Sequence, residues 1–353
     1  MSLGIWKYSY IGPKIHGMIT FMLTKDNFDE LVKKNLNEVY SFLEHTPYQE
    51  VISAVPIEHF DSATFEKFLV DHFLTTFDNI KRNSPKEVGS LLDAMLNKFE
   101  VENLRIILRA KIAGLNVDET MSYIIPVREF SEEFCKSLLE KSENVEDIVH
   151  LLMRTDYGPA LAKGLKDFEE TGLSISLETA LDQYVYESLW KEADKIGDAD
   201  RKIAKKIIGT EIDFANMKLI LRCKTLHIEA DQTRKLILPI FFQLTEESIN
   251  KSIEAENVES ALNLFMLRSY KNILSVVLAQ YKDSNLLSEV EQIFDEFLLK
   301  NNRDILKHPF PFDVGVVMSF LNVKWIEVKN LRAIVKGKED NVPEEAVQKK
   351  LLT

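Results

Sequence analysis

Three short segments of the chain carry charged side chains at repeated positions. Each segment begins with a carboxylate, has an asparagine three residues later, and continues with two basic residues four positions apart. The members are Glu100, Asn103, Arg105 and Arg109; Asp213, Asn216, Lys218 and Arg222; and Glu327, Asn330, Arg332 and Lys336. Basic residues four apart share one face of a helix, where they can bind carboxylates of the same protein or of a partner.

Two interpretations are open for these charges. The cations either pair inside the chain, where an exposed pair contributes only ~0–1 kcal/mol, or meet acidic groups of another subunit. The three carboxylates are either charges at helix starts or partners of a neighbouring arginine, or they form a polar ring at the mouth of a three-fold structure that grips a partner. For the cations we favour pairing within the chain. For the carboxylates we favour a charge at a helix start or a partner of a neighbouring arginine, because a structural partner would be triplicated whereas a catalytic acid need not be.

Motifs for other chemistry are missing from the sequence. There is no Walker-A loop, no glycine-rich dinucleotide fingerprint, no zinc-type histidine pair and no Gly-x-Ser-x-Gly. His150 stands among aliphatic residues and is expected to be a partly exposed or hydrogen-bonded helix residue. Cys223 occupies the position of Ala110 and Gly337 in the other segments, which favours a small packing residue over a reactive thiol. We therefore expect no catalytic residue, cofactor or metal.

The charged segments belong to a longer repeat. The nonapeptides that start at Asn103, Asn216 and Asn330 lie 113 and 114 residues apart. Two further blocks recur at nearly the same spacing. The first pairs Asn35 with Tyr48, Asn144 with Tyr157 and Asn257 with Tyr270. The second contains Glu66, Glu178 and Glu291. The repeat predicts an N-terminal extension over 1–13 and three helical domains over 14–126, 127–239 and 240–353. The C-terminus is then expected at a repeat boundary.

Each repeat has the pattern of helices. Apolar residues of the charged segments recur at helical spacing, as in Val101, Leu104, Ile107 and Leu108. Gly114 and Gly337 are expected as left-handed caps just past their helices. Residues 118–125 predict a short helix that Pro126 stops. Helix starts are predicted at Thr24, Ser131, Asn144, Thr245 and Asn257, while no sustained alternation of period two occurs. The fold class is all-α.

The composition of the chain argues against several classes of function. The formal net charge of −12 argues against a nucleic-acid binder, whose affinity comes mainly from neutralising phosphates. No apolar run approaches the ~18–20 residues that span a bilayer, and the N-terminus lacks the pattern of a secretory signal. We expect a soluble protein on the cytoplasmic side that does not insert into the bilayer.

The sequence resembles the C subunit of archaeal and bacterial A-type/V-type rotary ATPases, with the eukaryotic V-ATPase d subunit as a more distant relative. The segments that carry the resemblance are Leu23–Leu31, Ser41–Tyr48, Glu102–Lys111, Pro311–Leu321 and Glu327–Lys338. One departure concerns the N-terminus. The family has an Arg-rich amphipathic helix after an N-terminal Tyr, whereas Gly12, Pro13 and Gly17 are expected to break the helix here.

The resemblance implies a funnel-shaped body of three similar helical domains with pseudo-three-fold symmetry, present once per complex. It implies a non-catalytic central-stalk subunit on the cytoplasmic face of the membrane. That subunit couples the rotor shaft of subunits D and F to the proteolipid ring, so that ATP hydrolysis or synthesis is linked to H⁺ or Na⁺ translocation. The alternatives are a helical scaffold of another soluble complex and an all-α enzyme with a carboxylate-lined cleft. Such an enzyme would need a cluster of polar residues that is not repeated, and no such cluster is visible in the sequence.

Overall fold

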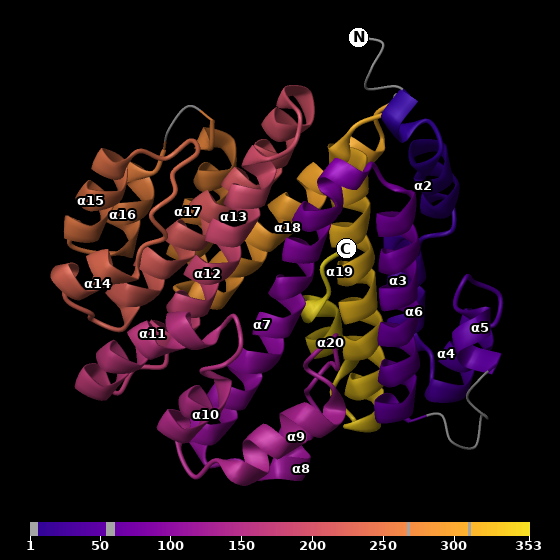
Figure 1. The fold of residues 1–353 in the computed structure, drawn as a ribbon, viewed down its shortest axis with the longest axis horizontal. Coiled ribbons are helices and arrows are strands. Elements are labelled where there is room, and N and C mark those ends of the chain that lie inside the picture. Colours follow the sequence, from indigo (N-terminus) through magenta and orange to yellow (C-terminus); the bar gives the residue numbers. More distant parts are fainter. Residues whose placement is uncertain (1–5, 54–60, 267–268, 310–311) are drawn as a thin grey trace. The chain divides into compact units, whose positions relative to one another are not determined.

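The structure, a computed structural model, describes residues 6–53, 61–266, 269–309 and 312–353 (Figure 1). Helices connected by turns and short loops make up these ranges, and no strand occurs within them. The all-α prediction is therefore confirmed. Two sequence-based predictions touch residues outside these ranges. They are the first part of the extension over 1–13 and Pro311 at the start of one family-like segment.

The helices recur in the same order three times, after a preceding helix α2 (Ile11–Ile19). The first set is α3 (Lys25–Lys33), α4 (Leu36–Leu43), α5 (Gln49–Ser53), α6 (Ser62–Asn83), α7 (Gly89–Ala113) and α8 (Val117–Met121), with a 3-10 turn η2 (Lys86–Val88) before α7. The second set is α9 (Glu132–Lys141), α10 (Val145–Leu152), α11 (Gly158–Thr171), α12 (Ile175–Asp194), α13 (Asp198–Thr225) and α14 (Ala230–Leu236). The third set is α15 (Glu246–Glu254), α16 (Val258–Leu264), α17 (Lys271–Ser284), α18 (Leu287–Leu306), α19 (Val314–Glu339) and α20 (Glu344–Lys350). The charged segments lie on α7, α13 and α19, the fifth helix of each set.

Polar side chains begin the short helices as predicted. Asn35, Asn144 and Asn257 precede α4, α10 and α16, and each side chain accepts a hydrogen bond from the backbone N–H three residues later. Ser131 and Thr245 cap α9 and α15 in the same way. Such caps satisfy N–H groups that have no partner inside the helix. The repeated asparagine of this block is thus a helix start in all three repeats.

The N-terminal helix corrects one expectation. Helix α2 runs from Ile11 to Ile19 and includes all three residues that were expected to break it. Pro13 is the third residue of this helix, within the first turn, where its missing N–H costs no intrahelical hydrogen bond. The side chains of Ile11 and Ile15 on this helix are buried. Their packing therefore outweighs the low helix propensity of the two glycines.

The C-terminal ends of the three long helices share one geometry. Gly114, His227 and Asn341 stand at equivalent positions and all have positive φ, at 69°, 55° and 54°. The predicted glycine cap is confirmed at Gly114 and wrong at Gly337, which is buried inside α19. There a Cβ would lie 2.6 Å from Cγ2 of Val347, so glycine permits α20 to approach closely. Helix α8 ends at Met121, four residues earlier than the predicted Ile125.

The chain forms two compact units in space. The first contains Met1–Leu92, Ile125–Val127 and Leu299–Thr353, and the second contains Asp93–Ile124 and Arg128–Leu298. Helices α7 and α18 each have residues in both units. The division into domains over 14–126, 127–239 and 240–353 stays a prediction.

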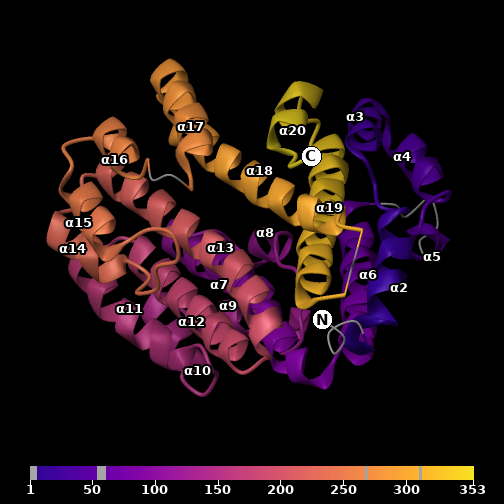
Figure 2. The ribbon, with the colours of Figure 1, turned by 90° about the horizontal axis from the view of Figure 1, so that it is seen from above.

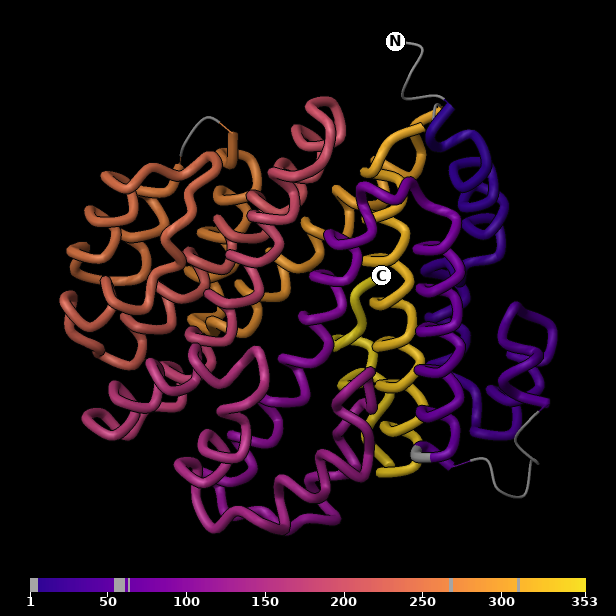
Figure 3. Tube along the Cα trace, in the orientation of Figure 1, coloured from indigo at the N-terminus to yellow at the C-terminus, as the bar shows by residue number. Residues whose placement is uncertain are grey.

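In the first unit, the last long helix packs against the first one. Helices α6 and α19 lie side by side in every view (Figures 1, 2 and 3). Phe73 of α6 contacts Trp325 of α19, with ring centroids 4.9 Å apart, and both rings are buried. Helix α19 also contacts α2, α3 and α4, so the C-terminal charged helix completes the core of the N-terminal repeat.

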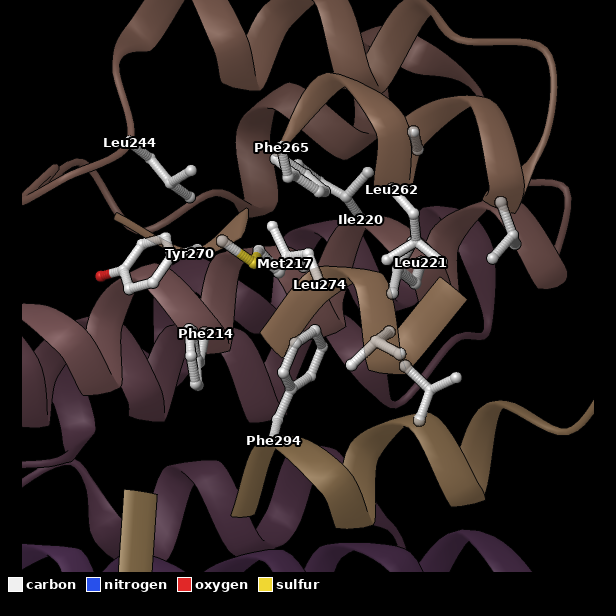
Figure 4. Packing of buried hydrophobic residues seen from close by; sticks show 14 of the residues in the cluster. Phe214, Met217, Ile220, Leu221, Leu244, Leu262, Phe265, Tyr270, Leu274 and Phe294 are labelled. Carbon is white, nitrogen blue, oxygen red and sulfur yellow. The ribbon is translucent and has the colours of Figure 1, made fainter. Parts of the chain in front are cut away.

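In the second unit, α13 has the same role for the third repeat. Phe214 and Met217 of α13 are fully buried in a core with residues of α15, α16, α17 and α18 (Figure 4). The ring of Phe214 lies 4.9 Å from that of Phe294 on α18, centroid to centroid. Burying each such side chain contributes ~1.5–3 kcal/mol. The long helix of one repeat thus packs with the shorter helices of the next.

We expect Leu331→Ala, on the fully buried face of α19, to lower the free energy of unfolding by ~2–5 kcal/mol. Amide hydrogen exchange should accelerate in α6 as well as in α19, because each helix is the other's packing partner. Leu115→Ala is the matched control, since this leucine is exposed and should leave stability and exchange unchanged. Faster exchange confined to α19 would contradict the interpretation.

Candidate functional site

The three repeated carboxylates are buried in the middle of long helices. Glu100, Asp213 and Glu327 have exposed fractions of 4%, 0% and 3%. Their helices begin more than ten residues earlier, so the expected position at a helix start is wrong. A buried carboxylate is costly unless its oxygens are hydrogen-bonded or paired. The surroundings of each one therefore decide what it does.

Each carboxylate accepts a hydrogen bond from a tyrosine of the next repeat. The hydroxyl of Tyr157 donates to Glu100, and that of Tyr270 donates to Asp213 at 2.8 Å. The third bond returns to the first repeat, because Tyr48 donates to Glu327 at 2.6 Å. Each tyrosine belongs to the repeated block seen in the sequence. These bonds fix the long helices to elements 57 to 279 residues away.

The Glu327 site contains two more donors. The ammonium of Lys324 lies 2.6 Å from Oε1 of Glu327 and also donates to the Tyr48 hydroxyl at 2.8 Å. The backbone N–H of Leu23 donates to Oε2 of the same carboxylate at 2.6 Å. Lysine, tyrosine and glutamate are all buried, so the positive and negative charges offset each other inside the first unit.

The two equivalent sites use different donors. Asp213 accepts three backbone N–H bonds, from Phe242 at 3.1 Å, Gln243 at 2.7 Å and Leu244 at 3.2 Å. For Glu100, none of the described residues donates a backbone N–H to the carboxylate, and Arg128 lies 3.5 Å from its other oxygen. The three sites thus keep the tyrosine bond while the remaining donors differ.

Burial sets the protonation of the tyrosines. Burial raises the pKa of Tyr48, Tyr157 and Tyr270, and the adjacent carboxylates raise it further. Each phenol is therefore a hydrogen-bond donor at neutral pH. Burial also raises the pKa of Glu100 and of Asp213, while their donors oppose the rise.

The repeated cations pair with carboxylates of the following repeat. Arg109 binds Glu178 through two nitrogens, one of them 2.8 Å from its acceptor. Arg222 binds Glu291 in the same bidentate way, with one bond of 2.7 Å. Such fork-like pairs are the strong form of ion pair. Bonds to Arg109 hold the pKa of Glu178 below its ordinary value, although burial acts in the opposite direction.

A second cation on each helix extends this pattern. Arg105 pairs with Asp182, and Lys218 lies 2.8 Å from Asp295. These acids follow Glu178 and Glu291 by one helical turn. Two cations therefore face two carboxylates both between the first and second repeats and between the second and third.

The first unit departs from the pattern. Arg332 pairs with Glu66, the equivalent of Glu178. One turn later stands Val70, so the position equivalent to Asp182 holds no carboxylate on α6. Lys336 instead contacts Asp340 at the end of its own helix at 3.2 Å. The structure therefore pairs all six candidate cations within the chain.

The repeated asparagines join the long helices to the segments that follow them. Asn216 donates to the carbonyl oxygen of Leu238 at 3.1 Å and accepts from its N–H at 2.9 Å. Asn330 makes the same pair of bonds with Leu352, at 2.7 and 3.1 Å. Asn103 is fully buried at the equivalent position.

A polar cavity of about 220 Å³ lies in the second unit between α7, α12 and α13. Arg105, Arg109, Lys218 and Arg222 line it together with Glu178 and Asp182. All six charged groups are ion-paired, so the cavity contains no unneutralised charge from this set. Within the ranges that the structure describes, no group of three potential metal ligands occurs.

Several contributing residues were not predicted. Asp182 and Asp295 could have been found, because they repeat the four-residue spacing of the cations they bind. Lys324 has no equivalent, as Asn97 and Thr210 stand at its position, so the repeat gave no signal for it. Two minor predictions agree with the structure. His150 is exposed, and the Cys223 thiol is buried with a raised pKa, as suits a packing residue.

Comparison with known proteins decides the family. The family model described as ATP synthase (C/AC39) subunit matches residues 11–350. The chain belongs to this family. Similar proteins include the C subunit of the A-type ATP synthase of Methanocaldococcus jannaschii, which is 28% identical over 100% of this chain and 88% of its own length. The corresponding protein of Methanosphaera stadtmanae is 28% identical over 98% and 88%, and that of Haloferax volcanii 24% over 97% and 97%.

The family resemblance inferred from the repeated segments is thereby confirmed. In the part of the chain that the structure describes, none of the helices combines the length and apolar character that crossing a membrane requires.

The tyrosine bonds predict an order of stability losses. We expect Tyr157→Phe to cost ~1–3 kcal/mol, because it removes the hydroxyl donor of Glu100 and leaves only the Arg128 contact. Tyr270→Phe should cost less, ~0.5–1.5 kcal/mol, since three backbone donors still satisfy Asp213. Urea unfolding measures both values, with the exposed Tyr123→Phe as control. A larger loss for Tyr270→Phe would refute this assignment.

His72 predicts a pH dependence of stability. Its ring lies 5.2 Å from that of Tyr48, and burial together with the Lys324 ammonium lowers the pKa of His72 to about 4. Between about pH 6.5 and 4 the unfolded chain binds a proton that the folded chain does not, so stability falls as the pH falls through this window. We expect His72→Gln to reduce that loss in unfolding experiments across this range. His45→Gln, at an exposed position, is the control and should reproduce the wild-type profile.

Proposed function

We propose that this chain is a non-catalytic subunit in the central stalk of a rotary A-type/V-type ATPase. In this proposal it couples the shaft of subunits D and F to the proteolipid ring on the cytoplasmic side of the membrane. One copy per complex links ATP hydrolysis or synthesis to H⁺ or Na⁺ translocation. The match to the family over nearly the whole chain is the observation that carries the proposal.

The use of the repeated polar residues supports a mechanical role. Carboxylates, cations and asparagines that could have formed an active site are instead bonded to neighbouring repeats. Fixing a long helix at several points along its length resists sliding and bending, because close-packed interiors have low compressibility and transmit strain. A rotor part that transmits torque has to keep its bonds under load, since slippage between its helices would dissipate energy without turning the ion-translocating ring.

Equivalent ion pairs join the first repeat to the second and the second repeat to the third. Arg109 with Glu178 and Arg222 with Glu291 are equivalent pairs. A single catalytic centre would need a group that is present in one repeat and left without an internal partner. The repeated charged residues do not provide one, which supports a subunit without chemistry of its own.

Deletion of the gene in its native host should test the proposal. We expect membranes of the deletion strain to lose ATP-driven ion pumping, measured by quenching of a pH-sensitive dye or by ²²Na⁺ uptake, and a plasmid copy to restore it. The tagged chain should co-purify with the catalytic head, the shaft subunits and the ring. Coupled pumping that persists without the chain would overturn the proposal. Recovery with a different soluble complex would favour the scaffold alternative.

A further inference from the structure

A groove in the first unit differs in charge from the corresponding regions of the other repeats. It has a volume of about 730 Å³ and lies between the end of α3, the start of α4, the end of α19 and α20. Val32, Leu36 and Val347 contribute apolar surface, while Lys33, Lys34 and Lys338 contribute ammonium groups. Glu344 is the carboxylate among the lining residues. The groove therefore combines apolar surface with a net positive lining.

Repeat equivalence shows that the charge of Lys33 and Lys34 is particular to the first repeat, whereas Lys338 has the equivalents Lys111 and Lys224. Counting from the asparagine cap of the second helix in each set, the two residues before it are Lys33 and Lys34 in the first repeat. The corresponding pairs are Ser142 and Glu143 in the second repeat, and Ala255 and Glu256 in the third. Two residues after the cap stand Asn37, Glu146 and Glu259. These three positions sum to +2 in the first repeat and to −2 in each of the others. A purely structural role for these positions gives no reason for the reversal.

The three lysines differ in how far contacts within the chain engage them. Lys34 contacts Glu30 of the preceding helical turn at 3.0 Å, a partly exposed pair of small energetic value. Among the described residues, Lys33 is exposed and has no ion-pair partner. Lys338 donates to the carbonyl oxygen of Val32, a neutral acceptor, at 2.6 Å. At least Lys33 is thus available to a ligand.

The groove continues along α4. A second depression of about 420 Å³ shares Lys34, Asn35 and Asn37 with it and extends to Phe42 and His45. The carboxylate of Glu38 lines this second depression, so the two depressions together contain three lysines and two glutamates. An elongated surface with an apolar, net basic lining suits a polypeptide segment better than a compact anion. The net charge of −12 on the chain disfavours binding of an extended polyanion or an anionic membrane surface. A short acidic segment is affected mainly by the charges beside it, which are the lysines of the groove.

We propose that this groove is the docking site for an acidic segment of a partner polypeptide, with Lys33 and Lys34 selecting its charge. Aliphatic side chains of the segment would contact Val32, Leu36 and Val347, and its carboxylates would lie beside the lysines. The inference rests on the proposed function in one respect: the segment belongs to another subunit of the same complex.

Site-specific cross-linking in the purified native complex tests this inference. The photoreactive residue p-benzoylphenylalanine replaces Asn37, which is exposed and lines both depressions. After irradiation, mass spectrometry identifies the attached peptide. We expect one segment of one other subunit, with more Asp and Glu than Lys and Arg. The same probe at Glu146, the equivalent position of the second repeat, should not attach to that segment.

Charge reversal supplies the second measurement. Lys33→Glu with Lys34→Glu gives this site the negative charge of Glu143 and Glu256, and we expect the cross-linking yield to fall about tenfold or more. Lys33→Glu alone should give a smaller fall, without disturbing any ion pair of the described chain. Unchanged yields in both variants would overturn the proposal.

The outcomes separate this inference from the proposed function. If the chain is recovered outside any ATPase complex, the proposed function fails. If it is recovered inside the complex but Asn37 attaches to lipid, to a neutral or basic segment, or only to its own chain, the docking site is wrong while the proposed function stands.

Discussion

The structure depends on the burial of a carboxylate in the middle of each long helix. Transferring such a group out of water is expensive, so it persists only where donors are fixed around it. A tyrosine of the following repeat provides one donor at all three places, to Glu100, Asp213 and Glu327. Because each bond needs both repeats in position, folding of one repeat is coupled to folding of the next.

Because of this coupling, a long helix and the helices that it packs with belong to different repeats of the sequence. Helix α13 belongs to the second repeat in sequence, yet its apolar face packs with α15 to α18 of the third. Helix α19 packs with α6 of the first repeat. The cations follow the same rule, as Arg222 with Glu291 shows. Helix α13 thus contributes to the core of the third repeat and α19 to that of the first, while α7 is bonded to the second repeat through Glu100 and Arg109.

The sequence predicted the helices well because their signals are local. Apolar spacing and side-chain caps, such as Asn144 before α10, depend on a few neighbouring residues. The tyrosine and carboxylate blocks were visible as repeats, but which tyrosine meets which carboxylate depends on tertiary packing. Gly337 shows the same limit, since its role comes from contact with Val347 on another helix. Lys324 could not be found at all, because it is present in one repeat only.

The pairing of α6 with α19 has a consequence for synthesis of the protein on the ribosome. Helix α6 ends at Asn83 and its partner begins at Val314. At about 5–20 residues per second, on the order of 10–50 s pass between their emergence. During this time the apolar face of α6, with Phe73 and Phe77, has no native partner from α19. The N-terminal repeat is made first and is completed last, so it is the part of the nascent chain with the longest exposure to chaperones and to aggregation.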